Sequence, residues 1–325
     1  MSLNRPIYKI KDWILKDKRR ICKHHLAINM NPHLIEFFKS NPEMIDWTLL
    51  SENPNAIELL QENKDKIGWS HLSFNPSAIT LLKDNQDKID WHQLSANVNA
   101  IEILYENLDN IDWIELSENP NAIKILEANQ DKIHWYALSR NPNAMSILKQ
   151  NTNKIYWDVL SMNPGAIEFL KANPDKINWI SLSRNPNAIE ILEENRDKID
   201  WYFLSANPSA INLLLDNFDK IDWYMFSNNP NIPIEVIEAN QDKVSWFSLS
   251  KNPNAIKFLE VYKNKINWLD IWVNPAIFEI DYETMKKNNE ELYDELIKEV
   301  MKPSRVFNYP EYDYIEELFG DDYLY

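Results

Sequence analysis

"WISLSRNPNAIEILEENRDKID", residues 179–200, is a stretch that the chain repeats with small changes from near its start to near its end. A tryptophan opens each copy, and nine of them, from Trp47 to Trp223, follow one another at intervals of 22 residues. The next interval, to Trp246, is 23 residues, and the last, to Trp268, is again 22. A fixed period of this length is typical of proteins built from stacked repeats.

Each fixed letter of the repeat has a structural reason. With the tryptophan as position 0, the unit reads W-x-x-L-S-x-N-P-N-A-I-x-L-L-x-x-N-x-D-K-I-D. The asparagine at +6 can accept a backbone N–H at a helix start, and the proline at +7 suits the first turn. Ala-Ile-x-Leu-Leu then places apolar side chains on one helix face. The asparagine at +16 is predicted to end that helix in left-handed backbone geometry.

A second helix is predicted at the tryptophan. A capping residue precedes most of the tryptophans, so W-x-x-L-S reads as a shorter helix, in α or 3₁₀ form, with tryptophan and leucine facing inward. One unit buries too few apolar side chains to offset the entropy of ordering its backbone, and neighbours must therefore stack. The sequence predicts an all-α solenoid, a right- or left-handed superhelix of about eleven two-helix repeats.

The expected outline is a superhelical rod with degenerate repeats as caps. Helix layers about 8–10 Å apart give eleven units a span on the order of 100 Å. Residues 1–46 form an N-terminal cap with a degenerate first repeat, in which His25 replaces the tryptophan and Asn31 and Pro32 keep the +6 and +7 places. Residues 47–267 are the regular array, and residues 268–325 a degenerate last repeat followed by a helical, acidic C-terminal cap.

Composition narrows the class of protein. The formal net charge is −16, which opposes binding to phosphate backbones. With only three glycines, the chain has no glycine cluster of the kind that cradles phosphate. The single cysteine, Cys22, excludes an intramolecular disulfide and fits a reducing compartment. No run of 18 apolar residues appears and the start lacks a signal-peptide core, so we expect a soluble intracellular protein without membrane contact.

Two phrases carry a resemblance to a known family. "LSRNPNAIEILEENRDKIDW" resembles a 22-residue W-x-x-L-S-x-N-P-N-A-I repeat that is abundant in giant viruses of amoebae, and "MKPSRVFNYPEYDYIEEL" resembles the segment that often follows those arrays. The resemblance covers nearly the whole chain from about residue 25. It implies a helical solenoid in the host cytoplasm, with the nucleus and the virion as alternatives, and it implies no activity and no functional residue.

The residues that could carry chemistry do not form a catalytic or metal-binding pattern. The serines at +4 recur without a base beside them, so we expect them to satisfy backbone groups between layers. The asparagines are predicted to form ladders of bonds through the stack. We therefore expect no catalytic residue, no cofactor and no metal site. His71, His92 and His134 fall at different repeat positions, whereas His24, His25 and His33 with Cys22 leave a metal site near the N-terminus as a weak alternative.

Positions +1 and +2 vary most between repeats and are predicted to form two columns along one surface. Repeat proteins commonly bind partners through such variable positions, and aromatic and methionine side chains are enriched in interfaces. The alternative is that some of these rings pack into the core beside the tryptophan. We predict that a protein partner, for which a host protein is one candidate, binds at Tyr136, Tyr202, Phe203, Tyr224, Met225 and Phe247.

The predicted function is a non-catalytic interaction scaffold or adaptor. An alternative is self-assembly, because residues 1–25 carry eight Lys/Arg and two Asp whereas residues 281–325 carry thirteen Asp/Glu and five Lys/Arg. Such ends could pair head to tail and make homo-oligomers. A weaker alternative is a nucleic-acid-binding repeat protein, which the acidic charge opposes.

Overall fold

The computed structural model describes residues 7–16, 21–287, 290, 297 and 298. The chain divides into two compact units, Ile10–Phe278 and Met1–Lys9 with Glu279–Tyr325. All the repeats lie in the first unit, which we call the repeat domain. Of the predicted C-terminal helical cap, residues 282–287 are helical, and the acidic segment from residue 299 onward lies outside the described residues.

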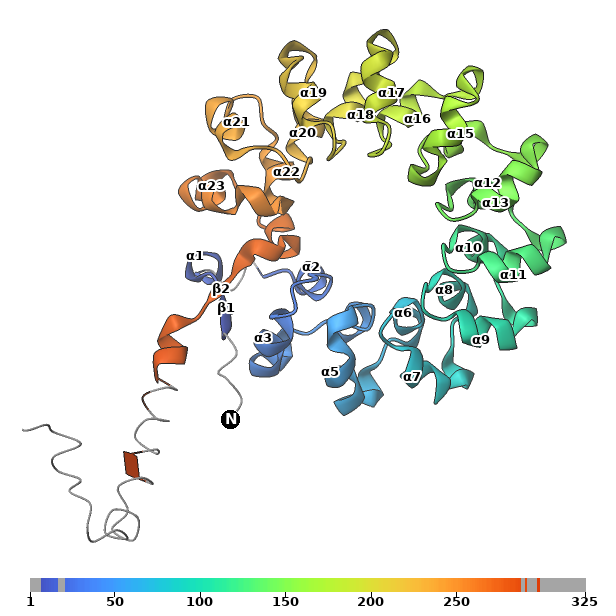
Figure 1. Cartoon of the computed structure of the whole chain (residues 1–325). Coiled ribbons are helices and arrows are strands. Elements are labelled where there is room, and N and C mark those ends of the chain that lie inside the picture. Colours follow the sequence, from blue (N-terminus) through green and yellow to red (C-terminus); the bar gives the residue numbers. More distant parts are fainter. Residues whose placement is uncertain (1–6, 17–20, 288–289, 291–296, 299–325) are drawn as a thin grey trace, which may run out of the picture. The chain divides into compact units, whose positions relative to one another are not determined.

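The repeat domain is the all-α solenoid that the sequence predicts. Each regular repeat gives one helix that begins at its tryptophan and one that begins at the isoleucine at +10 or its counterpart. The first set lines the central opening and the second set forms the outer wall (Figure 1). The inner helices are α2 (Lys23–Ala27), α4 (Trp47–Leu50), α6 (Trp69–Phe74), α8 (Trp91–Ala96), α10 (Trp113–Glu118), α12 (Trp135–Arg140), α14 (Trp157–Leu160), α16 (Trp179–Ser183), α18 (Trp201–Ser205), α20 (Trp223–Ser227) and α22 (Trp246–Lys251).

The outer helices carry the second apolar face of each repeat. They are α3 (Leu34–Ser40), α5 (Ile57–Glu62), α7 (Ile79–Lys83), α9 (Ile101–Glu106), α11 (Ile123–Ala128), α13 (Met145–Gln150), α15 (Ile167–Lys171), α17 (Ile189–Glu194), α19 (Ile211–Leu215), α21 (Ile234–Ala239) and α23 (Ile256–Val261). Before the array lies the short helix α1 (Asp12–Leu15), and the strands β1 (Tyr8–Ile10) and β2 (Phe278–Ile280) pair with each other.

The 3₁₀ geometry occurs in more places than expected. The inner helices from α2 to α22 are α-helices, the inner helix of the last repeat is 3₁₀, and a separate 3₁₀ turn follows most outer helices at +17 to +19. These turns are Pro42–Met44, Lys64–Lys66, Gln86–Lys88, Leu108–Asn110, Gln130–Lys132, Thr152–Lys154, Pro174–Lys176, Arg196–Lys198, Phe218–Lys220 and Lys263–Lys265. Further 3₁₀ turns are Pro54–Ala56, Pro164–Ala166, Pro253–Ala255, Asp270–Val273 and Pro275–Ile277.

The +16 asparagine ends the outer helix without left-handed geometry, so that expectation is wrong. Asn63, at the end of α5, has φ −131° and ψ 51°. Its side-chain Nδ2 donates to the carbonyl of Leu59 at 2.9 Å. The amide side chain thus satisfies a carbonyl that the helix end leaves open, which removes the need for a left-handed residue there.

A ladder of buried asparagines at +6 joins successive repeats. In a typical case, Nδ2 of Asn75 donates to the carbonyls of Ser51 and Asn53 in the preceding repeat, at 2.9 and 3.0 Å. Oδ1 of Asn75 accepts the backbone N–H of Ser77 at 2.9 Å. Within the described residues the ladder has twelve members, all at most 4% exposed: Asn29, Asn53, Asn75, Asn97, Asn119, Asn141, Asn163, Asn185, Asn207, Asn229, Asn252 and Asn274.

The +4 serines form a second column of interlayer bonds, as predicted. Oγ of Ser95 donates to the carbonyl of Trp91 at 2.7 Å, one helical turn back. The same oxygen accepts the N–H of Asp112, the residue that precedes the next tryptophan, at 3.0 Å. A hydroxyl is well suited to this place because it donates and accepts through one atom.

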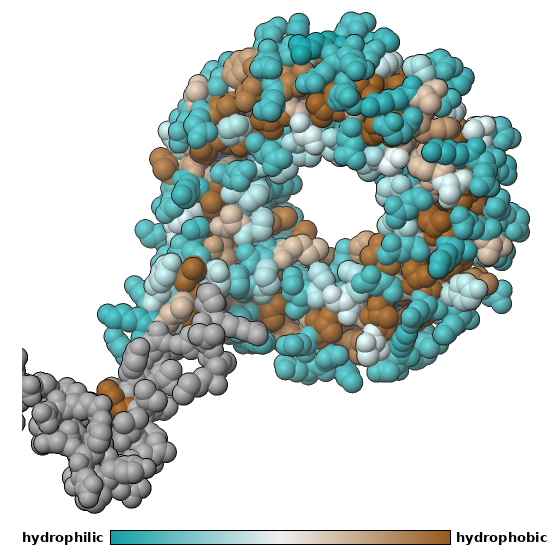
Figure 2. Space-filling model, viewed as in Figure 1, coloured by the Kyte–Doolittle hydropathy of each residue, from teal (hydrophilic) through white to brown (hydrophobic). Residues whose placement is uncertain are grey.

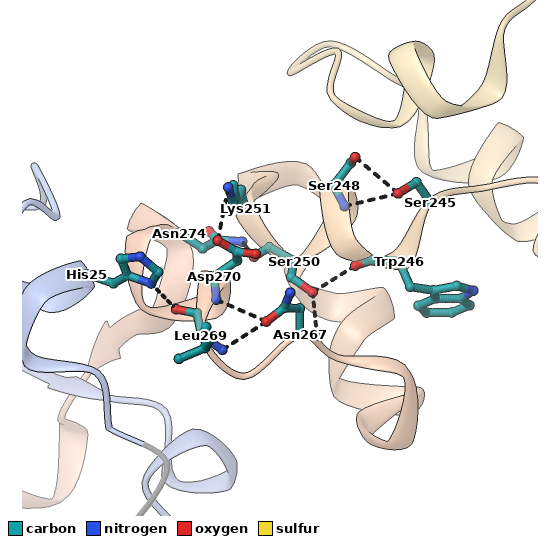
Figure 3. Close-up of polar contacts among 10 residues, drawn as sticks. All are labelled: His25, Ser245, Trp246, Ser248, Ser250, Lys251, Asn267, Leu269, Asp270 and Asn274. Carbon is teal, nitrogen blue, oxygen red and sulfur yellow. Dashed lines mark hydrogen bonds and ion pairs between the residues drawn. The ribbon is translucent and has the colours of Figure 1, made fainter.

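The ladder closes on itself, so the expected open rod is wrong. Asn29 Nδ2 donates to the carbonyls of Trp272 and Asn274 in the last repeat, at 2.9 and 3.1 Å. Nδ1 of His25 lies 2.6 Å from the carbonyl oxygen of Leu269, as Figure 3 shows. The repeat domain is therefore a ring of twelve repeats whose first and last members pack together. A small rotation per repeat, summed over twelve stacked units, completes one turn.

Closure also corrects the register of the first repeat. Asn29 fills the ladder place that the sequence assigned to Asn31, so Lys23 stands where other repeats have tryptophan, in place of His25. His24 then takes position +1 and pairs with Asp46, as His92 pairs with Asp112 three repeats later. The first repeat is 24 residues long, from residue 23 to residue 46. Because this length differs from the usual 22, the register of the first repeat could not be read from the period.

The tryptophans lie at the edge of the core. They are partly buried and pack against it, whereas the leucines at +3 are fully buried. The lysine at +19 covers the outer face of several rings, with Nζ at 4.6 Å from the ring centroid for Lys66 over Trp47 and at 4.3 Å for Lys154 over Trp135. The lysine stem and charge thus shield an aromatic face that the stack leaves open.

We expect Asn141→Ala to lower the free energy of unfolding by about 1–3 kcal/mol, because it leaves buried carbonyls without donors. The measurement is urea denaturation followed by circular dichroism. Asn143→Ala is the control, since Asn143 is exposed and its side chain donates one bond, to the carbonyl of Pro120 at 3.0 Å. Equal losses in the two variants would contradict a special role for the ladder.

Closure predicts a short distance between spin labels at Met30→Cys and Pro275→Cys in a Cys22→Ser background, because Asn31 Nδ2 lies 2.8 Å from the carbonyl oxygen of Pro275. Pulsed electron paramagnetic resonance measures it. An open rod would separate the labels by on the order of 100 Å. The control pair, Met30→Cys with Thr152→Cys, joins opposite parts of the ring. A 30–275 distance longer than the 30–152 distance would refute closure.

Candidate functional site

Position +1 is exposed in every repeat that a tryptophan marks. It is polar in the first three of these, at Thr48, Ser70 and His92, and becomes mostly apolar from Ile114 onward. Only Asp158 interrupts the apolar run. Together with Tyr156, whose ring lies 5.4 Å from that of Tyr136, these side chains form what we call the apolar arc. Its members are Ile114, Tyr136, Tyr156, Ile180, Tyr202, Tyr224, Phe247 and Leu269.

The apolar arc is large for an exposed surface. Its side chains are between 44% and 60% exposed. A fully buried aromatic side chain covers roughly 150–250 Å², so the five half-exposed aromatic side chains of the arc and its three aliphatic ones together present several hundred Å². Monomeric proteins rarely expose more than that without an interaction to cover it. Figure 2 shows hydrophobic residues spread along the ring between hydrophilic ones, around an open centre.

The predicted partner-binding residues divide into two groups. Tyr136, Tyr202, Tyr224 and Phe247 are exposed and belong to the arc. The other two predicted residues, at +2, are half-buried, and position +2 is fully buried in some repeats, so this position is not a surface column throughout. The sequence prediction did not include four residues of the arc. Three of them stand at +1 and the tyrosine stands at −1, so their repeat positions could have indicated them: Ile114, Tyr156, Ile180 and Leu269.

The two half-buried residues line a small pocket between the tryptophan helices of successive repeats. In each tryptophan helix +3 and +4 are buried toward the outer helix, so +2 and +5 lie on the opposite side. Phe203 and Met225 meet there with Arg184, around a pocket of about 170 Å³. The guanidinium carbon of Arg184 lies 3.5 Å from the centroid of the Phe203 ring, and the ring of Tyr202 meets Phe203 edge-on at 5.0 Å.

A related pocket lies two repeats earlier along the chain, and its arginine pairs with a carboxylate of the same chain. It has a volume of about 140 Å³ and is lined by Glu118, Arg140, Val159, Met162, Asn163 and Pro164. Arg140 stands at +5, like Arg184, but its Nε lies 3.0 Å from the carboxylate of Glu118. The arginine of this pocket is thus neutralised within the chain, which makes it an internal comparison for the first.

The polar part of the +1 column carries a pH-sensitive cap. Asp112 begins α10 and accepts the N–H groups of Ile114 and Glu115 at 2.9 and 3.2 Å. Nδ1 of His92 lies 2.9 Å from the same carboxylate. The hydrogen bond to Asp112 raises the pKa of His92 above its ordinary 6.5, and the charge of Glu115 adds to this. Burial opposes ionisation of Asp112, but the bond from His92 and the backbone N–H groups lower its pKa overall.

The described residues show no arrangement suited to catalysis on a metal. Among them, no group of three or more His, Cys, Asp or Glu side chains could hold an ion. The +4 serine hydroxyls are engaged with backbone, as in Ser95 and Ser183. In the same part of the chain no helix has both the length and the apolar character needed to cross a bilayer.

Comparison of the chain with models of protein families, with curated proteins and with solved structures finds no match.

The His92–Asp112 pair predicts a titration that can be followed by nuclear magnetic resonance of the His92 ring. Because the folded pKa is raised above 6.5, the pair stabilises the fold below that pH and its contribution is lost as pH rises through the folded pKa. Asp112→Asn keeps a capping oxygen but removes the charge, so the His92 pKa should fall toward 6.5. The same midpoint in both proteins would show that the pair does not set it.

Proposed function

We propose that this protein is a non-catalytic scaffold or adaptor that binds a protein partner along the apolar arc. The observation that supports this most is the arc itself, a run of exposed apolar side chains at one repeat position over more than half of the ring. Aromatic and aliphatic side chains exposed in this way are costly to keep in water and are typical of protein-binding surfaces.

A binding role also fits how the repeat uses its polar residues. The recurring asparagines and serines donate to backbone carbonyls between layers, as Asn75 and Ser95 do. Their side chains are then committed to the fold, whereas the exposed +1 position is free to differ from one repeat to the next. On the sequence resemblance alone, we further propose the cytoplasm of an infected host cell as the location.

Self-assembly ranks below partner binding. A head-to-tail polymer of open solenoids would pair the first repeat of one chain with the last repeat of another. In the ring those two repeats bond to each other within one chain, through Asn29 and Asn274. Nucleic-acid binding ranks lower still, because a net charge of −16 repels a phosphate backbone.

The test compares binding by the wild type with binding by a variant that carries Tyr202→Ser, Tyr224→Ser and Phe247→Ser. These residues are 46–55% exposed, so the substitutions should leave the helical circular dichroism unchanged. We expect proteins that wild type captures from lysate of an amoebal host to be lost with the variant. The control is Tyr105→Ser, which alters a tyrosine 63% exposed on α9, in the outer wall. Capture that survives the triple substitution would remove the arc as the binding surface.

A further inference from the structure

We infer that the pocket beside Arg184 recognises an acidic side chain next to an apolar one in a segment of the protein partner. The inference rests on the proposed function and adds the chemistry of the bound segment. Arg184 and Arg140 stand at the same repeat position in two related pockets, but within the part of the chain that the structure describes only Arg140 faces a carboxylate.

The difference is the residue that faces each arginine from the preceding repeat. Arg140 has Glu118 at +5 of the repeat before it, and the two form an ion pair at 3.0 Å. For Arg184 the residue at the same place is Met162. Among the described residues Arg184 takes part in no ion pair, and its contact is with the ring of Phe203 at 3.5 Å. The chain therefore keeps a stacked guanidinium without the carboxylate that neutralises its counterpart.

A stacked guanidinium is well placed to bind a carboxylate. Its flat face covers the aromatic ring, while its N–H groups lie in the plane and remain free to donate in pairs to two oxygens. Stacking on Phe203 also limits the rotamers of a long side chain, so less entropy is lost on binding than for a freely moving arginine. Arg184 is thus prepared for a planar, two-oxygen acceptor.

The rest of the pocket suits an apolar group beside that acceptor. Phe203, Ala206 and Met225 line it, and its volume of about 170 Å³ is of the order of a single side chain. Methionine adapts to partners of different shape. Tyr202 contacts Phe203 edge-on at 5.0 Å, which connects the pocket to the apolar arc. A segment lying along the arc could place an aliphatic or aromatic side chain in the pocket and a neighbouring Asp or Glu on Arg184.

Charge favours this occupant over two others. A polyphosphate such as nucleic acid meets the repulsion of a net charge of −16, whereas one carboxylate on a short segment needs only one cation. A second copy of this chain meets the same repulsion.

The experiment is a selection from a displayed library of random heptapeptides on wild type, Arg184→Gln and Arg140→Gln. We expect wild type to enrich peptides with Asp or Glu beside an aliphatic or aromatic residue. Arg184→Gln should lose the acidic enrichment and keep the apolar one, whereas Arg140→Gln should behave like wild type, because Arg140 is already paired. Circular dichroism checks that all three proteins fold alike.

The best selected peptide, labelled with fluorescein, is then compared with the peptide in which its acidic residue is replaced by the matching amide. The amide should bind wild type about tenfold more weakly, as expected for a charged hydrogen bond, and bind Arg184→Gln as well as the acidic peptide does. Those results would couple Arg184 to the carboxylate.

Two results would overturn the inference. One is wild type selecting apolar peptides without acidic enrichment, or no peptides at all. The other is an acidic preference that persists in Arg184→Gln. In the first case, loss of partner capture by the Tyr202, Tyr224 and Phe247 variant would still support the arc, so the two proposals fail separately. Concentration-dependent association of wild type without peptide would instead assign the surface to a second copy.

Discussion

The buried amide of the +6 asparagine is the interaction on which the ring depends. Its side-chain nitrogen donates to two carbonyls of the preceding repeat, and its side-chain oxygen accepts a backbone N–H of its own repeat, as in Asn185. A fully buried amide is costly unless such partners are present. Each repeat must therefore offer carbonyls at the same two places to the next, which holds the stack to one geometry and explains the near-constant period.

The same bonds account for closure. Because the junctions repeat one set of contacts, with a single carbonyl partner in place of two for Asn252, they rotate by nearly the same amount, and an accumulated full turn brings the first repeat to the last. Asn29 and Asn274 then meet the same donors and acceptors as any internal pair. One repeat has an extra residue near Pro233. The asparagine ladder continues there, because Nδ2 of Asn252 donates to the carbonyl of Asn229 at 2.9 Å. The ring thus accommodates one insertion without losing continuity.

The ladder also decides where the surface is free to differ. Positions +3, +4, +6 and +9 are committed to packing or to bonds between layers, whereas +1 is exposed, and a polar residue there can bond to the residue that precedes the next tryptophan, as His92 does to Asp112. The type of residue at +1 changes along the array: it is polar in the early repeats and mostly apolar from Ile114 onward. An exposed position on a rigid, regular frame places successive side chains at fixed intervals, which is the property that a binding surface for an extended segment needs.

The sequence by itself determined the two helices of each repeat, the cap before most tryptophans, the interlayer roles of the +4 serine and +6 asparagine, and the exposed aromatic residues such as Tyr202. These depend on contacts within a repeat or between neighbours, and the 22-residue pattern states them repeatedly. Only the tertiary structure decided that the stack closes, that Asn29 replaces Asn31 in the ladder, that Phe203 is half-buried, and that Arg184 lacks the acid that Arg140 has. The reason is that closure follows from a small rotation summed over twelve junctions, and pairing at +5 follows from which residues the stack brings together; neither is written in any single repeat.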